Sequence, residues 1–377
     1  MAKITEIAKK IKIEEYVLIG CSLFFLILSI ILSPSNNFMS LFKSGLVVIK
    51  SSIEWYQGIF LFLLIAFFFY ITFRIYVFLA KKASSFPDKN QERFSFDFSA
   101  IRNLRFALRA LIPILISFSS SLLVVGAIKT KIGGNLVNVR LLEIDRILTG
   151  NYPFIWLHTS SNPLESLFNS ISPAIIFIFT SLNIVIGISI VLFYLDKRRQ
   201  LFKGLILSMF FVMFLSIPLW YLFPANSPSN AFLQNPKNSA SWQTETDYLN
   251  PQVRSFQKEM WERQKESLPI TTMPSMHWAW TMIIAYFFFK KNRKTLFISI
   301  PWMLITLFGT VYLGCHYLID GIVSIPLTIL SIAIACFFVR IEKSYYKEDS
   351  REEKFKERVK EDFLKPFKEI KYQLLNK

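Results

Sequence analysis

Long apolar runs constrain this chain more than any other feature. A helix needs about 20 apolar residues to cross the hydrocarbon core of a bilayer. Eight runs approach that length, at roughly 16–33, 58–80, 106–128, 173–195, 204–223, 272–289, 295–314 and 317–340. We therefore expect an all-α fold, a polytopic membrane helix bundle with about eight transmembrane helices.

Composition and charge support a membrane protein. The chain is 53% hydrophobic and 16% aromatic, with a mean hydropathy of +0.41, which lies outside the balance of a soluble domain. The net charge of +17 could indicate nucleic acid binding, but the Lys and Arg residues lie in short runs beside the apolar segments. That distribution is typical of cytoplasmic flanks that meet anionic lipid, and we expect no nucleic acid partner.

The basic runs also orient the bundle. Lysines precede the first apolar run, basic residues fill the connection from 81 to 109, and the motifs "DKRRQLFK" and "KKNRK" follow the fourth and sixth runs. All four fall on one side of an eight-helix chain, which the positive-inside rule assigns to the cytoplasm. Both termini are then cytoplasmic, and the loops 129–172 and 224–271 face the periplasmic, extracellular or lumenal side.

Two of the three histidines are predicted to meet at that outer side. His277, in "PSMH", lies near the outer end of the sixth run, and His316, in "GTVYLGCHYLIDG", follows the seventh. The 39 positions between them suit two spans and a tight turn. Asp320 follows His316 by four positions and shares a helix face with it. A carboxylate on one ring nitrogen leaves the other as an oriented base or nucleophile.

These residues also fit other interpretations. A histidine at a helix end is often structural, His-x-x-x-Asp can be a packing contact, and a His, His, Asp set can bind zinc. The convergence of two histidines with an acid favours a functional site, because ionisable groups inside a membrane usually have a function. His158, in "FIWLHTSS", lacks such a partner and is expected to be structural.

These residues resemble the motifs of a known family. "PSMH" and "TVYLGCHYLIDG" are similar to the Pro-Ser-x-His and His-x-x-x-Asp elements of the type 2 phosphatidic acid phosphatase superfamily. "EIDRILTGNYPFIWLH", with Asp145, resembles a stretch of its inositol phosphorylceramide synthase branch. The resemblance implies that His316 attacks phosphorus to form a phosphohistidine, that Asp320 orients the ring, and that His277 transfers protons. It also implies no metal and no other cofactor.

The phosphate-binding groups depart from the family pattern. Thr310 stands where the superfamily carries an Arg six residues before the nucleophilic His, and Ser229 and Asn230 stand where another Arg often follows the fifth helix. Phosphate oxygens need donors or cations around them. The candidates are Ser275, Thr310, Arg140, Arg146 and the backbone amides near Gly314. The two arginines are equally suited to lipid head groups.

The sequence thus predicts an enzyme acting on membrane lipids. The preferred activity is an inositol phosphorylceramide synthase-like phosphotransferase that moves a phosphorylated head group from a phospholipid to a lipid alcohol. A lipid phosphate or pyrophosphate phosphatase is the first alternative, and a non-catalytic transporter or lipid-binding bundle is the second. Trp242, Tyr248 and Trp261 of the outer loop are expected to shape an acceptor pocket.

Three parts of the chain are expected. Residues 1–104 carry two transmembrane helices and a basic connection, and residues 105–340 form a six-helix catalytic core with outer loops. Residues 341–377 form a basic tail whose apolar residues recur at helical spacing. That tail is predicted to lie on the inner leaflet as an amphipathic helix or to pair with a partner protein.

Overall fold

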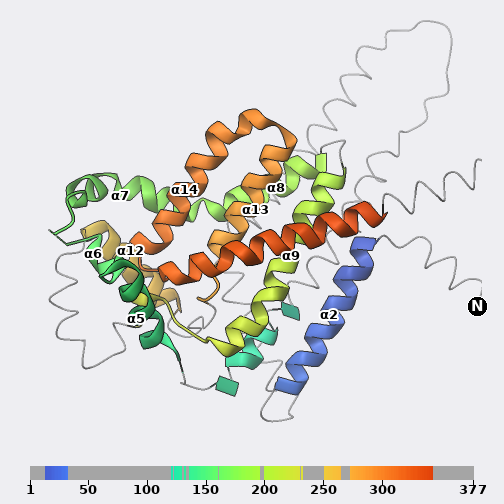
Figure 1. The fold of residues 1–377 in the computed structure, drawn as a ribbon, viewed down its shortest axis with the longest axis horizontal. Coiled ribbons are helices and arrows are strands. Elements are labelled where there is room, and N and C mark those ends of the chain that lie inside the picture. The colour runs from blue at the N-terminus through green and yellow to red at the C-terminus, as the bar shows by residue number, and fades with distance from the viewer. Residues whose placement is uncertain are drawn as a thin grey trace, which may run out of the picture.

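The computed structural model describes residues 13–32, 120–121, 123–129, 131–132, 136–159, 161–195, 199–229, 231, 250–264 and 272–342. The regular elements in this part of the chain are helices (Figure 1). The predicted span 58–80, the basic connection after it and residues 343–377 of the predicted tail lie outside the described residues. So do the side chains of Trp242, Tyr248 and Trp261, which were expected to shape an acceptor pocket.

Three described helices are long and apolar enough to cross a membrane. They are Gln200–Leu222 within α9 (Arg199–Leu222), Arg293–Tyr312, which joins η1 (Arg293–Thr295) to α14 (Leu296–Tyr312), and the final helix, Leu318–Glu342. A fourth span results if the bent pair α7 (Glu165–Thr180) and α8 (Leu182–Leu195) counts as one. The described part of the chain therefore supports a helical membrane protein, and the predicted number of eight spans is not confirmed.

The predicted span 173–195 differs from the observed helices. Helix α7 begins at Glu165, so Pro173 lies inside it, and a bend of 42° follows at the break between α7 and α8. A proline cannot donate to the carbonyl four residues earlier. That carbonyl, of Asn169, accepts hydrogen bonds from Ser172 Oγ and from Asn250 Nδ2, both at 3.0 Å. The bond from Asn250 attaches the segment that leads into α12 (Pro251–Gln264) to this helix.

Helix α13 (Met276–Lys291) lies at the centre of the bundle, where it packs against α8, α9 and α14 (Figure 1). Its buried residues Ile283, Ile284 and Phe287 form one apolar core with residues of α8 and α9. Gly204 of α9 lies so close to the Phe287 ring that an added Cβ would come within 2.7 Å of it. A larger residue at that position would require the Phe287 ring to shift.

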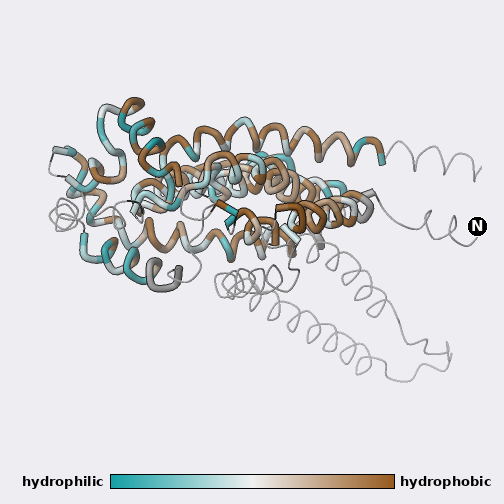
Figure 2. Tube along the Cα trace, turned by 90° about the horizontal axis from the view of Figure 1, so that it is seen from below, coloured by the Kyte–Doolittle hydropathy of each residue, from teal (hydrophilic) through white to brown (hydrophobic). Residues whose placement is uncertain are grey.

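A second apolar core joins α2 (Ile13–Leu32) to the bundle. Leu18 and Phe25 of α2 pack with Val124, Ile128 and residues of α9. Hydrophobic residues follow the long helices for most of their length, whereas hydrophilic residues are more frequent at the end that contains α5 (Asn138–Thr149) and α6 (Pro153–Trp156) (Figure 2). These two elements lie against the connection from α14 to the final helix, since Asp145 of α5 accepts from the Leu318 amide and α6 contacts α14.

An ion pair closes the opposite end of the bundle. Lys203 Nζ of α9 lies 2.5 and 2.6 Å from the two carboxylate oxygens of Glu342, at the end of the final helix. Both side chains are nearly buried, with exposed fractions of 14% and 8%. Removing one partner from such a pair leaves a poorly solvated charge.

We expect Lys203→Met to destabilise the folded protein by about 3 kcal/mol because the Glu342 carboxylate loses its partner. Thermal unfolding of the purified protein in detergent measures the effect. The double variant Lys203→Met, Glu342→Leu should recover most of the loss, since it removes both charges. A double variant as unstable as the single one would show that the ion pair itself is not the cause.

Candidate active site

A tight turn between α14 and the final helix carries His316. The amides of Cys315 and His316 both donate to the Thr310 carbonyl, at 3.0 and 3.1 Å, which reverses the chain just beyond α14. Gly314 has a φ of +67°, a conformation that other residues adopt only with strain. A Cβ at this glycine would also come within 2.7 Å of the Phe154 ring. The turn therefore depends on glycine at position 314.

The environment of His316 fixes where its ring proton lies. Its Nδ1 is 3.0 Å from the Thr272 carbonyl oxygen and 3.3 Å from Asp320 Oδ2. A carbonyl oxygen only accepts, so Nδ1 carries the hydrogen and Nε2 carries a lone pair. Burial lowers the pKa of His316 to about 4, which keeps the ring neutral at pH 7. These features leave Nε2 as a neutral nucleophile or base.

His277 faces that lone pair. Its Nδ1 lies 3.1 Å from His316 Nε2, and its ring stacks on Phe179 of α7 with the ring centroids 4.8 Å apart. Because His316 Nε2 accepts in this contact, His277 Nδ1 is the donor. Ser275 caps the helix start by accepting from the Trp278 amide, and so places His277 in the first turn of α13.

Asp320 is held between the two motifs. Its side chain is fully buried, and Oδ2 accepts from the Tyr317 amide at 2.9 Å as well as facing His316. Its backbone carbonyl accepts from the Ser275 amide at 3.2 Å. The first turn of the final helix is thus bonded directly to the "PSMH" segment, and the structure brings His277, His316 and Asp320 together as the spacing predicts.

Asp145 contributes to the site from another part of the chain. This buried residue of α5 accepts from the amides of Leu318 and Ile319, at 2.8 and 2.9 Å. The first amides of a helix have no acceptor within the helix itself, and the helix dipole also favours a carboxylate at this end. Burial raises the pKa of Asp145 to about 6, although the two backbone donors act in the opposite direction. Asp145 therefore fixes the helix start on which His316 and Asp320 depend.

The four predicted phosphate ligands lie in two different environments. Ser275 and Thr310 are fully buried beside the histidines, but the Thr310 hydroxyl donates to the Leu307 carbonyl and accepts from Trp278 Nε1, both at 2.7 Å. Arg140 is exposed, and Arg146 is exposed and pairs with Glu143 at 2.8 Å. Among the described residues, the histidine pair bonds to Thr272 and Asp320 and to neither of these arginines.

The backbone near Gly314 is also occupied. The amides of Leu313, Gly314, Cys315 and His316 all donate to carbonyls of α14. Ser229, which stands where the family often has an arginine, does reach this turn, because its amide donates to the Gly314 carbonyl at 3.2 Å. The backbone amides near Gly314, which the sequence suggested as phosphate donors, therefore hold the turn together.

His158 has the structural environment expected of it. Its side chain is 1% exposed, and Nε2 donates to the Tyr312 carbonyl at 2.8 Å. The ring also packs against Tyr312 with the centroids 4.3 Å apart. This contact braces the end of α14 just before the Gly314 turn.

Metal binding was an alternative for the histidines and the acid. Within the part of the chain that the structure describes, no group of three or more His, Cys, Asp or Glu side chains is arranged to hold a metal ion. The facing nitrogens of His277 and His316 form a hydrogen bond with each other instead.

Replacing Asp145 tests its role at the start of the final helix. We expect Asp145→Ala to destabilise the protein by about 2 kcal/mol, because two buried amides lose their acceptor. Hydrogen exchange followed by mass spectrometry should show faster exchange in the peptide that contains Leu318 and Ile319. Glu143→Gln, on the exposed face of the same helix, should leave that peptide unchanged. Equal protection in Asp145→Ala would exclude the capping role.

Comparison with known proteins agrees with the motifs. No curated protein and no solved structure matches the chain. Residues 156–334 match a family model described as the PAP2 superfamily, a range that includes His277, His316 and Asp320 but not Asp145. The match supports the type 2 phosphatidic acid phosphatase superfamily, whose members are typically phosphatases or phosphotransferases.

Proposed function

We propose that this protein is a lipid phosphotransferase that moves a phosphorylated head group to a lipid alcohol through a covalent intermediate on His316. One observation supports this most: His316 Nε2 carries a lone pair, because Nδ1 is bound to Thr272 and Asp320, and it faces the proton donor His277 at 3.1 Å. A nucleophile next to an acid is what attack on phosphorus requires. The superfamily match supports a phosphatase or a phosphotransferase.

The first half of the reaction uses both rings. His316 Nε2 attacks phosphorus, and the bond from phosphorus to the leaving lipid oxygen breaks. For this step we propose that His277 is in its imidazolium form, which the bound phosphate stabilises, and that it gives its Nδ1 proton to that oxygen and becomes neutral. The phosphorylated imidazole is positively charged, and the buried Asp320 carboxylate next to Nδ1 stabilises it.

The second half reverses these roles. His277, now lacking its proton, accepts the proton of an acceptor hydroxyl, whose oxygen attacks phosphorus. The bond between phosphorus and Nε2 then breaks, and both rings return to their starting protonation. A lipid alcohol as the acceptor gives transfer, and water gives hydrolysis.

Substrate binding must move His277. An attacking atom lies about 3 to 3.5 Å from its target in a reactive arrangement. His277 Nδ1 occupies that position 3.1 Å from His316 Nε2. The phosphate therefore replaces the contact between the two rings, and His277 shifts toward the leaving oxygen. The resting arrangement is then the substrate-free state.

The surroundings of the site favour a lipid acceptor over water. His316 is 7% exposed, and α12 lies over this end of the bundle. Gln257 of α12 donates to the Leu313 carbonyl at 3.2 Å, and Phe256 packs on Phe179, the ring on which His277 stacks. The resemblance to the inositol phosphorylceramide synthase branch supports the same choice. A lipid phosphatase is the alternative if water reaches the intermediate.

The groups that neutralise the phosphate are part of the proposal. Ser275 and Thr310 are proposed to donate from beside the histidines, which for Thr310 requires the hydroxyl to leave the Leu307 carbonyl. Arg140 and Arg146 are on the surface of α5, where they suit anionic lipid head groups. We propose that they attract the donor lipid to this end of the bundle.

We further propose that the site opens on the non-cytoplasmic side. Four basic residues, Lys290, Lys291, Arg293 and Lys294, lie at the connection between α13 and α14, at the opposite end of α13 from His277. Helix α13 has 16 residues and is about 24 Å long, which is shorter than the hydrocarbon core of about 30 Å. With the lysines at the inner surface, the histidines lie below the outer surface.

Reporter fusions test this orientation. A fusion after Lys377 should be active in the cytoplasm, and an insertion near Asn238 should be active on the other side. An insertion at Asn292, between α13 and α14, should behave like the fusion after Lys377. Cytoplasmic activity of the Asn238 reporter would reverse the proposed orientation.

Lipid mass spectrometry tests the activity. Purified protein is incubated with a phospholipid extract, ceramide and diacylglycerol, and compared with His316→Ala, Asp320→Asn and the surface control Ile298→Ala, at a side chain that is 78% exposed. We expect a new phospholipid that His316→Ala makes at least about 1,000-fold more slowly, since the nucleophile is absent. Ile298→Ala should retain the activity.

The products also separate the alternatives. Dephosphorylated lipid without exchange would establish a phosphatase. No change with the intact protein would favour a non-catalytic bundle, and unchanged turnover in His316→Ala would exclude the mechanism.

A further inference from the structure

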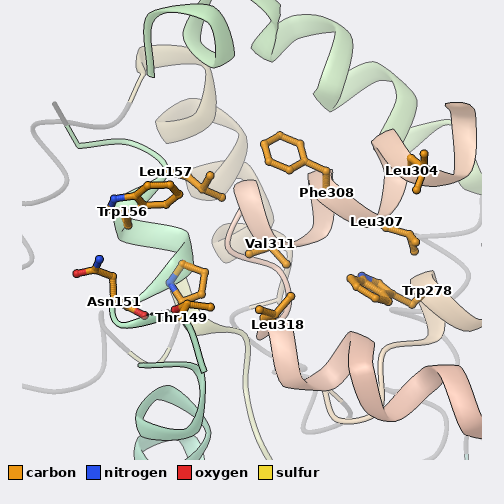
Figure 3. A pocket seen from close by; sticks show the side chains of 11 residues that line it. Thr149, Asn151, Trp156, Leu157, Trp278, Leu304, Leu307, Phe308, Val311 and Leu318 are labelled. Carbon is orange, nitrogen blue, oxygen red and sulfur yellow. Dashed lines mark hydrogen bonds between the residues drawn. The ribbon is translucent and has the colours of Figure 1, made fainter. Parts of the chain in front are cut away.

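A groove of about 480 Å³ lies beside the histidine site (Figure 3). One wall is α14, which contributes Leu304, Leu307, Phe308 and Val311. These positions have the spacing of one helix face, on a helix that qualifies as a membrane span. From Leu304 to Val311 the wall extends about 10 Å along the helix. The groove is therefore open along the side of a span, where a membrane protein meets lipid.

The two ends of the groove differ in polarity. Thr149 and Asn151 lie near Trp156 at the α5 and α6 end, whereas Leu304 and Leu307 lie at the other (Figure 3). Tryptophan is enriched where the hydrocarbon core meets the head groups. Trp156, which is 37% exposed, therefore marks the interfacial end. A molecule with one polar and one long apolar part matches this arrangement.

Trp278 connects the groove to the histidine pair. It follows His277 in the chain, and its ring lies across the groove from Trp156, with Val311 and Leu318 between them (Figure 3). Its Nε1 donates to Thr310 Oγ1, and its ring covers Gly321 so closely that a Cβ there would overlap it. Gly321 follows Asp320. Anything that displaces the Trp278 ring will thus press on both catalytic motifs.

We propose that this groove binds one hydrocarbon chain of the lipid substrate, with the chain lying along the apolar face of α14. This inference rests on the proposed function and adds to it the place where the substrate is held. Apolar walls of this kind gain free energy only from an apolar occupant. The volume is within the range of single-ligand sites. Lateral entry from the bilayer needs no passage through water.

Filling the groove tests the assignment by kinetics. Leu307→Trp places a large side chain in the groove, and Ile298→Trp is the matched control, since Ile298 lies on the same helix and is 78% exposed. We expect Leu307→Trp to raise KM at least 5-fold for a long-chain phospholipid donor and to leave KM for its dihexanoyl analogue within 2-fold. Ile298→Trp should change neither. An equal rise for both donors would overturn the assignment.

Photo-crosslinking tests the groove without requiring turnover. A phospholipid with a diazirine in the middle of one acyl chain is irradiated with the full-length His316→Ala protein in vesicles. Labelled peptides should contain Trp156 or residues 304–311, and Leu307→Trp should reduce that labelling at least 5-fold. Labelling spread evenly over lipid-facing helices would overturn the groove. Since this assay does not depend on catalysis, groove labelling together with no lipid product from the intact protein would reject the proposed function alone.

Discussion

The hydrogen bond from His316 Nδ1 to the Thr272 carbonyl determines what the histidine pair can do. A neutral imidazole has one donor and one acceptor, so this bond assigns the lone pair to Nε2 and makes His277 the donor in the contact between the rings. Thr272 is itself held in place, since its hydroxyl donates to the Ala225 carbonyl at 2.6 Å. Ala225, in the segment after α9, thus helps to hold the carbonyl that fixes the protonation of His316, which lies 91 positions later in the chain.

The same end of the bundle is assembled by side chains that satisfy backbone groups far away in sequence. Asp145 accepts from the first amides of the final helix, and Asn250 donates to the Asn169 carbonyl, which also accepts from the Ser172 hydroxyl. Asn138 accepts from the Asn226 amide at 2.9 Å. Bonds of this kind pair polar backbone groups, which are costly to bury without a partner. Short helices and connections around the spans thus hold a site that no single helix could form.

The sequence predicted the parts of this site that local spacing encodes. Two spans with a tight turn return His316 to His277, and a separation of four residues places Asp320 on the same helix face as His316. The direct contact between the rings, the Thr272 acceptor and the cap by Asp145 were not predicted. Asp145 lies 173 positions from Leu318, and no periodicity or local motif reports such a partner. The predicted span 173–195 likewise missed the first turns of α7, which begins at Glu165, because the residues there are less apolar than the run after Pro173.

The account depends on His316 forming a bond to phosphorus. The most direct measurement is to incubate the protein with phospholipid labelled with ³²P in the head-group phosphate, quench it rapidly in base, and map the label. The account predicts acid-labile, base-stable label on the peptide that contains His316, lost when acceptor lipid is added and absent from His316→Ala. Product formed by the intact protein with no label on His316 at any quench time, or label on another residue, would contradict it.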